Sequence, residues 1–500
     1  MGLSVEPPPP GGGGGGNSSD GGGGGVGGKG GLTAVATTTA VSVAAGPRGG
    51  HGISGPSPPP PPASARPSPP TDTTAVRYAV APMMDVTDRH FRTLARLISR
   101  RAVLYTEMVV DKTLIHNPRL RERSLALPAV PPLVPSGGGG GGPPRPPTTP
   151  EGGMDPVAGA IAPGHDGVPP PSLSCPPQTQ HPVVLQLGGS DPEELAAAVA
   201  LSLPYGYTEI NLNCGCPSPT VAGKGAFGAA LMKTPSLVAD ATRRMAEAAE
   251  YSLPITVKCR LGVDTDDSYE SLLRFVDTVS SAGGVRHFSI HARAAILNGL
   301  SPAQNRSIPP LRYGHVYRLA AERPNLVISL NGGVKGLAAV DEHLDAGVAG
   351  VMVGREVMDR PWHALVGVDA RVYGEVASPP VSRREVLTAY AAYAEAEVAG
   401  GAPIRAVVKP LLGLFAGEAN GKRWRRAFDG GLIRKMGVRD LIDTGMAVLS
   451  DAVLDRRTPE VPRPPPRPLG VASLDAPATG GGVTPSAGAP VPEAPVAQEV

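Results

Sequence analysis

The chain has 500 residues and a formal net charge of only +2, so the charge of the whole chain provides no field that would attract nucleic acid. Glycine (66) and proline (59) make up a quarter of the residues, which indicates long low-complexity segments beside a folded part. Residues 31–46, the most apolar run, are interrupted by threonines and are too short to span a membrane. Four cysteines in a chain of this length exclude a disulfide-stabilised scaffold.

Three glycine- and proline-rich segments lack hydrophobic periodicity, and we predict that they are disordered. Residues 1–74 and 458–500 form two tails, and residues from about 128 to 180 form a long insertion in a surface loop. A docking role for a tail is the alternative. No arginine precedes Arg48, and residues 21–71 contain no acidic residue, so the compartment stays open between the cytoplasm and an organelle (plastid or mitochondrion).

Short apolar runs rich in β-branched residues alternate with helical periodicity through residues 75–375. Helices are expected between the strands, for example over residues 191–201, 236–250 and 269–282. Eight successive β/α units predict a TIM (β/α)8 barrel, an α/β fold, and a doubly wound open sheet is the alternative. The predicted strands are residues 77–81, 103–106, 183–187, 209–213, 255–258, 287–291, 326–330 and 350–353.

A C-terminal all-helical domain is predicted over residues 380–457. Ser382-Arg-Arg-Glu385 has the spacing of a capping box, in which each side chain satisfies a backbone N–H at the start of a helix. A basic stretch follows, with one acid, Asp429, and one interleaved aromatic residue, Trp424. Such a stretch is typical of a surface that contacts a nucleic-acid backbone, and a solvated helix face is the alternative. Its basic residues are Lys422, Arg423, Arg425, Arg426, Arg434, Lys435 and Arg439.

Polar residues gather where the predicted strands end. In a TIM barrel the carboxyl ends of the strands form the face on which the chemistry takes place. Asn331-Gly-Gly333 and Gly354-Arg355 follow the last two strands, where this fold usually binds phosphate. Lys258 and His291 are candidates to contact a flavin, because a cation or donor stabilises the anionic reduced ring.

Cys216 lies in Gly-Cys-Pro just past the fourth predicted strand, at the expected mouth of the barrel. A cysteine thiol in water titrates near pH 8.5, so at neutral pH it carries a proton and can act as a general acid. A small buried hydrophobic residue is the alternative. Cys214 and Cys216 have no second cysteine pair to complete a zinc site, and we predict no metal. Cys259 is expected to pack in a strand and Cys175 to have no role.

The residues at the strand ends belong to longer motifs in a fixed order. These motifs are Ala81-Pro-Met-Met-Asp85, Gln186-Leu-Gly-Gly189, Asn211-Leu-Asn-Cys-Gly-Cys-Pro-Ser218, Phe227-Gly-Ala-Ala-Leu-Met232, Val257-Lys-Cys-Arg260, His291-Ala-Arg293, Gly299-Leu-Ser-Pro302 with Asn305-Arg306, Ile308-Pro-Pro310 and Asn331-Gly-Gly333. Over residues 76–456, without the insertion, they resemble the tRNA-dihydrouridine synthase family. Leu412-Gly-Leu-Phe415 followed by Trp424-Arg-Arg426 resembles its A-type subfamily.

The resemblance implies an FMN-binding TIM barrel that uses NADPH to reduce FMN and then reduces the C5–C6 double bond of uridine in the tRNA D-loop to 5,6-dihydrouridine. The A-type resemblance implies positions 20 and 20a. Hydride would pass from reduced FMN to C6, and Cys216 would give a proton to C5. By the same resemblance, the residues that bind FMN would be Pro82, Met83, Met84, Gln186, Lys258, His291, Asn331, Gly332, Gly333, Gly354 and Arg355. The residues that contact tRNA would be Asn213, Arg306, Lys422 and Arg425.

The sequence also departs from the family and leaves other functions open. Ala303 stands where the subfamily usually has lysine after Ser-Pro, which removes one expected tRNA contact. Another FMN-dependent barrel, of the dihydropyrimidine or dihydroorotate type, would act on a free base and would not need the basic helical domain. A non-catalytic tRNA-binding protein would not need Cys216. We expect the tRNA-modifying enzyme, as a monomer with no membrane contact.

Overall fold

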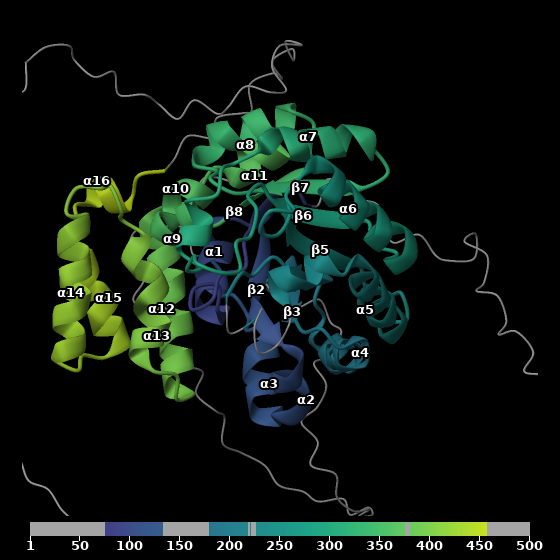
Figure 1. The fold of residues 1–500 in the computed structure, drawn as a ribbon. Helices are drawn as coiled ribbons and strands as arrows, with labels where there is room; N and C mark the ends of the chain where they lie inside the picture. Colours follow the sequence, from purple (N-terminus) through teal and green to yellow (C-terminus); the bar gives the residue numbers. More distant parts are fainter. Residues whose placement is uncertain (1–75, 134–179, 219–220, 222–226, 376–380, 458–500) are drawn as a thin grey trace, which may run out of the picture. The chain divides into compact units, whose positions relative to one another are not determined.

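Eight parallel strands close into a barrel in chain order, with helices between them (Figure 1). The computed structural model describes residues 76–133, 180–218, 221, 227–375 and 381–457, and these all belong to one unit, Arg66–Val500. The two predicted tails and most of the predicted insertion lie outside the described residues. The predicted TIM barrel is confirmed, and the open sheet is excluded because the first strand pairs with the last.

Seven of the strands follow the prediction to within about two residues, and the second is longer than predicted. It continues to Val110 instead of ending at Thr106, with an irregularity in its register between Tyr105 and Met108. The extension carries Glu107 to the loop after the first strand, where the N–H of Asp85 donates to its carboxylate. The strands are β1 Tyr78–Val80, β2 Val103–Val110, β3 Val183–Gly188, β4 Glu209–Cys214, β5 Ile255–Arg260, β6 His287–His291, β7 Val327–Asn331 and β8 Gly350–Val353.

The helices around the barrel begin and end at residues whose chemistry favours those positions. Asp191 accepts from two backbone N–H groups at the start of α4, and the left-handed Gly284 ends α6. The three helices predicted by range are present. The helices and turns of this part are α1 Arg89–Ile98, α2 Asp111–His116, α3 Pro118–Leu125, α4 Pro192–Ser202, η3 Leu203–Tyr205, η5 Gly228–Lys233, α5 Pro235–Ala248, α6 Tyr269–Gly283, η6 Gln304–Arg306, α7 Tyr313–Glu322, α8 Gly336–Asp345, α9 Arg355–Asp359, α10 Pro361–Leu365 and α11 Val368–Tyr373.

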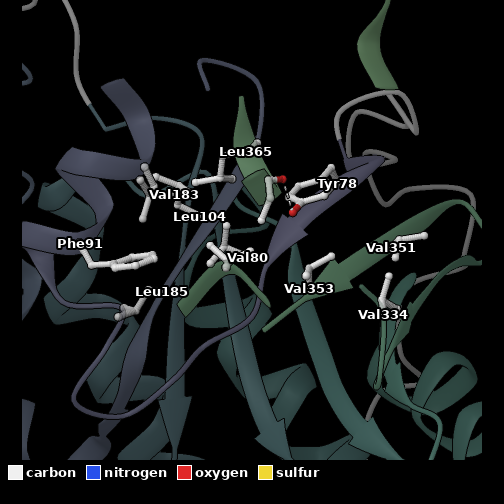
Figure 2. Packing of buried hydrophobic residues seen from close by; sticks show 14 of the residues in the cluster. Tyr78, Val80, Phe91, Leu104, Val183, Leu185, Val334, Val351, Val353 and Leu365 are labelled. Carbon is white, nitrogen blue, oxygen red and sulfur yellow. Dashed lines mark hydrogen bonds between the residues drawn. The ribbon is translucent and has the colours of Figure 1, made fainter. Parts of the chain in front are cut away.

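Alternate residues of each strand face the helices and the barrel interior. Val80, Leu104 and Val183 belong to the large hydrophobic core outside the barrel, part of which Figure 2 shows. A separate, smaller cluster consists of Ala79, Ala81, Val103, Tyr105, Val184 and Met352. The hydroxyl of Tyr78 donates to the carbonyl of Ala364 at 2.8 Å, so α10 is fixed to the first strand by a buried hydrogen bond.

The C-terminal part is helical, as predicted, and it begins with the predicted capping box. Glu385 N–H donates to the Ser382 hydroxyl (3.2 Å), and Ser382 N–H donates to the Glu385 carboxylate (2.8 Å). Within the described residues, no helix is both long and apolar enough to cross a bilayer. The elements are α12 Arg383–Ala399, α13 Ile404–Val408, η7 Lys409–Gly413, α14 Gly421–Ile433, α15 Val438–Met446 and α16 Asp451–Leu454.

Trp424 is a core residue of this helical part. Its ring is fully buried and packs between Phe415 and Phe428, with ring centroids 4.7 and 4.6 Å away. Its indole N–H donates to the carbonyl of Leu411 at 3.0 Å. The interpretation of Trp424 as an aromatic residue interleaved in a nucleic-acid surface is therefore wrong, because one face of α14 buries it while the opposite face carries the charges.

The predicted insertion, taken from about residue 128 to 180, is too long at its ends. Residues 128–133 are described, and Val130 is buried in the core. Gln180 is also buried, and its amide donates to the carbonyl of Arg89 and to the hydroxyl of Thr93, each at 2.7 Å. No local sequence pattern indicates these contacts, because the partners of Gln180 lie on α1, far away along the chain.

Candidate active site

The strand ends bring most of the predicted residues to one end of the barrel. Paired residues on neighbouring strands project to the same side of a sheet. The register pairs Asn213 on β4 with Lys258 on β5, and His291 on β6 with Asn331 on β7. Gln186 on β3 joins them, since the Asn213 amide donates to its side-chain oxygen at 2.8 Å. These five predicted residues therefore share the barrel mouth.

The backbone of Cys216 is fixed from two sides just beyond β4. The side-chain oxygen of Asn213 accepts from the N–H groups of Gly215 (3.0 Å) and Cys216 (2.9 Å). The N–H of Ala229 donates to the Cys216 carbonyl at 2.9 Å. Gly228 has a φ of +69°, and a Cβ there would lie 2.6 Å from the same carbonyl oxygen, so only glycine fits.

The described cysteines differ in burial, and Cys259 packs in a strand as predicted. Cys214 and Cys259 are fully buried, and burial raises the pKa of both thiols. Cys216 is only partly buried and packs against the edge of the hydrophobic core. Cys175 lies outside the described residues. Of the described cysteines, only Cys216 is accessible at the mouth.

Lys258 and His291 have unusual electrostatics because they are removed from water. Burial, with the neighbouring charge of Arg260, lowers the pKa of Lys258 to about 8. Burial and nearby cations, Arg260 among them, hold the pKa of His291 well below its usual range. At neutral pH Lys258 is mostly a cation and His291 is neutral. Neither side chain has a hydrogen-bond or ion-pair partner among the described residues, so the mouth is prepared for an anionic or electron-rich ligand.

The two glycine motifs after β7 and β8 differ in how strictly they need glycine. Gly332 has a φ of +117°, and a Cβ there would lie 2.5 Å from the His291 ring; Gly333 has a φ of +71°. The hydroxyl of Tyr313 donates to the Gly332 carbonyl at 2.7 Å and fixes this turn. Gly354 has an ordinary φ of −114° and room for a Cβ, 3.5 Å from Ala81. Glycine is therefore required at Gly332 and Gly333 after β7, whereas Gly354 after β8 has room for a side chain.

The remaining predicted cofactor residues lie at the rim. Pro82 and Met83 are partly buried in the loop after β1, whereas Met84 is 58% exposed. A Cβ on Gly354 would lie 3.6 Å from the sulfur of Met83, so the loops after β1 and β8 are neighbours. Arg355 is exposed, and its guanidinium donates to the carbonyl of Arg306 at 3.1 Å.

The residues predicted to contact tRNA fall into two environments. Asn213 is buried, and both ends of its amide are bonded within the protein, so it can meet only a nucleotide that enters the mouth. Arg306 is exposed in η6, close enough to the mouth to touch Arg355. Lys422 and Arg425 are exposed on α14, away from the face that buries Trp424.

Arg260 is a site residue for which the sequence analysis assigned no role. Its buried guanidinium donates to the carbonyls of Gly215 (3.1 Å), Ala294 (3.0 Å) and Asn305 (2.9 Å). It therefore joins the loop of Cys216 to the loops that follow β6, including the segment of Arg306. The available signal was its position two residues after Lys258, which places both on the same face of β5.

The fold and the mouth together define a TIM-barrel enzyme with a binding site for an anionic or electron-rich ligand at the carboxyl ends of its strands. A cation that is unpaired among the described residues and a neutral imidazole at the mouth suit an electron-rich or anionic ring. The turn after β7 requires glycine at Gly332, because its φ is +117° and a Cβ there would meet the His291 ring. Cys216 adds a free, partly exposed thiol to the same rim.

Comparisons with known proteins identify the particular family within this class. The family model described as "Dihydrouridine synthase (Dus)" matches residues 79–133 and 171–441. A protein of Xanthomonas axonopodis pv. citri named tRNA-dihydrouridine(20/20a) synthase is 40% identical over 372 residues, which are 74% of this chain and 93% of its own. A protein of the same name from Vibrio vulnificus is 39% identical over 71% of this chain and 91% of its own. The chain belongs to the dihydrouridine synthase family, and the resemblance to its A-type subfamily is confirmed.

A solved structure of a 2-naphthoyl-CoA reductase complex also aligns with part of the chain. The TM-score is 0.28, with 9% identity over 34% of this chain and 27% of that chain. This overlap is too small to carry an argument about function.

Proposed function

We propose that the protein reduces the C5–C6 double bond of uridines 20 and 20a in the tRNA D-loop, with NADPH as the reductant and FMN as the bound cofactor, and that it acts as a monomer. The observation that carries the proposal is the mouth itself. Lys258 and His291 lack partners within the described residues, Gly332 admits no side chain, and Cys216 lies on the same rim. The names of the relatives support the substrate and the positions.

Each part of the mouth has a separate task in this reaction. When FMN is bound and reduced by NADPH, it supplies the hydride that C6 of uracil accepts. Lys258 and His291 would hold the polar edge of the ring, and the turn at Gly332 and Gly333 would hold the phosphate. Cys216 gives its thiol proton to C5, which completes the reduction by two electrons and two protons in total. The backbone bonds to Asn213 and Ala229 keep its side chain at a fixed place on the rim.

The tRNA must present a uridine out of its stack, because the reacting carbons have to reach a mouth inside the barrel. Extrusion of a base costs a few kcal/mol, and contacts to the phosphate backbone can offset it. Lys422 and Arg425 on α14, with Arg306 beside the mouth, are exposed and would supply such contacts.

The deciding experiment is dihydrouridine formation on defined tRNA. Purified protein would be checked for bound flavin and for mass in solution, then incubated with NADPH and unmodified tRNA, and reduced uridines would be mapped by position. Product at 20 and 20a supports the proposal, and product elsewhere in the D-loop contradicts the positions. A folded, flavin-loaded protein that reduces free uracil but no tRNA would instead favour the dihydropyrimidine-type alternative.

A further inference from the structure

The interior of the barrel below the mouth is polar, and its polar groups are connected to one another. Glu209, Asn211 and Asn213 alternate along β4, which places all three on one face of the strand. Each is buried, and each is bonded to side chains of the neighbouring strands. A TIM barrel more often fills this space with branched apolar residues. The proposed reaction does not use Glu209 or Asn211, which leaves their burial to be explained.

The bonds form one unbroken series from the foot of the barrel to the loop of Cys216. The Thr256 hydroxyl donates to Glu209 at 2.6 Å, and the Asn211 amide donates to Thr256 at 2.8 Å. The Gln186 amide donates to the side-chain oxygen of Asn211 at 2.8 Å, and the Asn213 amide donates to that of Gln186 at 2.8 Å. We call these five residues the interior network.

All hydrogen bonds of the interior network donate in the same direction, toward the barrel foot, because the series ends there at the Glu209 carboxylate. A carboxylate only accepts, so Thr256 must give its single hydroxyl proton to Glu209 and can then only accept from Asn211. Each amide above is turned by the same logic, with its nitrogen toward the foot and its oxygen toward the mouth. The last oxygen, that of Asn213, is thereby free to accept from the N–H groups of Gly215 and Cys216.

We infer that Glu209, Thr256 and Asn211 are positioning residues that fix the amide orientations of Gln186 and Asn213 and, through them, the backbone that carries Cys216. The inference rests on the proposed function of Cys216 as the proton donor. Glu209 lies four residues before Asn213 on β4, roughly 13 Å along the strand, so it acts from outside the mouth. Tyr105 and His287 also contact the Glu209 carboxylate, each at 3.3 Å, and hold it in place.

Thr256→Val tests the network with little change in volume. The variant removes the oxygen that accepts from the Asn211 amide. The amides of Asn211, Gln186 and Asn213 are then no longer held in one orientation. At saturating tRNA we expect uridine reduction to slow by about tenfold or more, because a small misplacement of a reacting group has effects of this size. The melting temperature falls, because the buried Glu209 and Asn211 each lose a partner, and the rate is therefore measured per bound flavin in folded protein. In the protein without substrate, alkylation of Cys216 by iodoacetamide, mapped by mass spectrometry, becomes faster as its loop loosens.

Two variants serve as controls for this substitution. Thr256→Ser keeps the hydroxyl and should restore both rates. Thr242→Val removes another fully buried hydroxyl, one that donates to the Val238 carbonyl inside α5, and should change neither rate. If Thr256→Val does not fold, Asn211→Leu breaks the same series one link higher and takes its place, with the same two rates expected.

The outcomes separate this inference from the proposed function. Wild-type behaviour of Thr256→Val in both measurements overturns the inference, and so does a Thr256→Ser variant as impaired as Thr256→Val. If the wild-type protein reduces no uridine, the proposed function fails. The alkylation rates of Cys216 in the same variants then decide alone whether the network positions that loop.

Discussion

The barrel mouth and the outer face of α14 both carry positive charge, but the charge is buried in the mouth and exposed on α14. Lys258 in the mouth is largely withdrawn from water, and its pKa is lowered to about 8 as a result. Lys422, Arg423 and Arg425 on α14 are exposed and have no ion pair among the described residues. A buried charge attracts one bound ligand strongly, because little water screens it, whereas exposed charges attract a ligand weakly and in a salt-dependent way. We therefore expect single substitutions to have large, specific effects in the mouth and small, additive ones on α14.

The largest effect is expected at Cys216. Cys216→Ala removes the proton donor and should slow uridine reduction by about 100-fold or more, with flavin content and tRNA affinity unchanged. Single-turnover mapping of dihydrouridine measures the rate. Cys259→Ala is the matched control, because it removes a buried thiol of β5 and should leave the rate near that of the wild type. Full activity of Cys216→Ala would exclude Cys216 as the acid.

The next effect is expected at the turn after β7. Gly332→Ala places a Cβ 2.5 Å from the His291 ring at a φ of +117°, which should destabilise the fold by about 1–3 kcal/mol and reduce flavin content. Absorbance at the flavin band and thermal melting measure the two losses. Gly347→Ala is the control, since it has a φ of +95° but open space around it. It should lower the melting temperature and leave the flavin bound; equal flavin loss in both variants would contradict the assignment.

The lowered pKa of Lys258 predicts a dependence of stability on pH in the protein without cofactor. Between about pH 8 and 10.5 the unfolded chain still holds a proton that the folded protein has released, so the free energy of unfolding rises with pH in this window. With allowance for the partial exposure of Lys258, the rise is about 1–2 kcal/mol. Chemical denaturation at several pH values measures it, and Lys258→Met should lack the rise. The same slope in both proteins would show that another group causes it.

The smallest effect is expected on α14. Arg425→Ala should weaken tRNA binding less than about tenfold, equally for different tRNA sequences, and should reduce the slope of log affinity against log salt by about 1. Arg439→Ala is the control, because Arg439 is already paired with Glu395 at 2.6 Å. Titrations at several salt concentrations measure both. An unchanged salt slope in Arg425→Ala would remove Arg425 from the tRNA surface.

The secondary-structure elements and the residues at the mouth could be predicted from local sequence patterns. Strand and helix periods, a capping box at Ser382 and polar residues at strand ends are local features, so β1 to β8 and residues such as Lys258 and His291 could be found before any contact was known. The exposed and buried faces of α14 follow a helical period too. The basic composition of the stretch suggests that Trp424 is exposed, whereas its position in the helical period places it on the buried face.

Contacts between side chains of different elements could not be predicted in this way, because they depend on how the strands and helices pack. The partners in the interior network come from β3, β4 and β5, so Gln186 and Asn211, or Asn211 and Thr256, become neighbours only when the strands pair in one register. The three carbonyls bound by Arg260 and the burial of Gln180 against α1 likewise depend on closure of the barrel. Local propensity acts over a few residues, whereas hydrogen bonds between distant segments form only after the chain has paid the entropy of folding, and no local pattern records them.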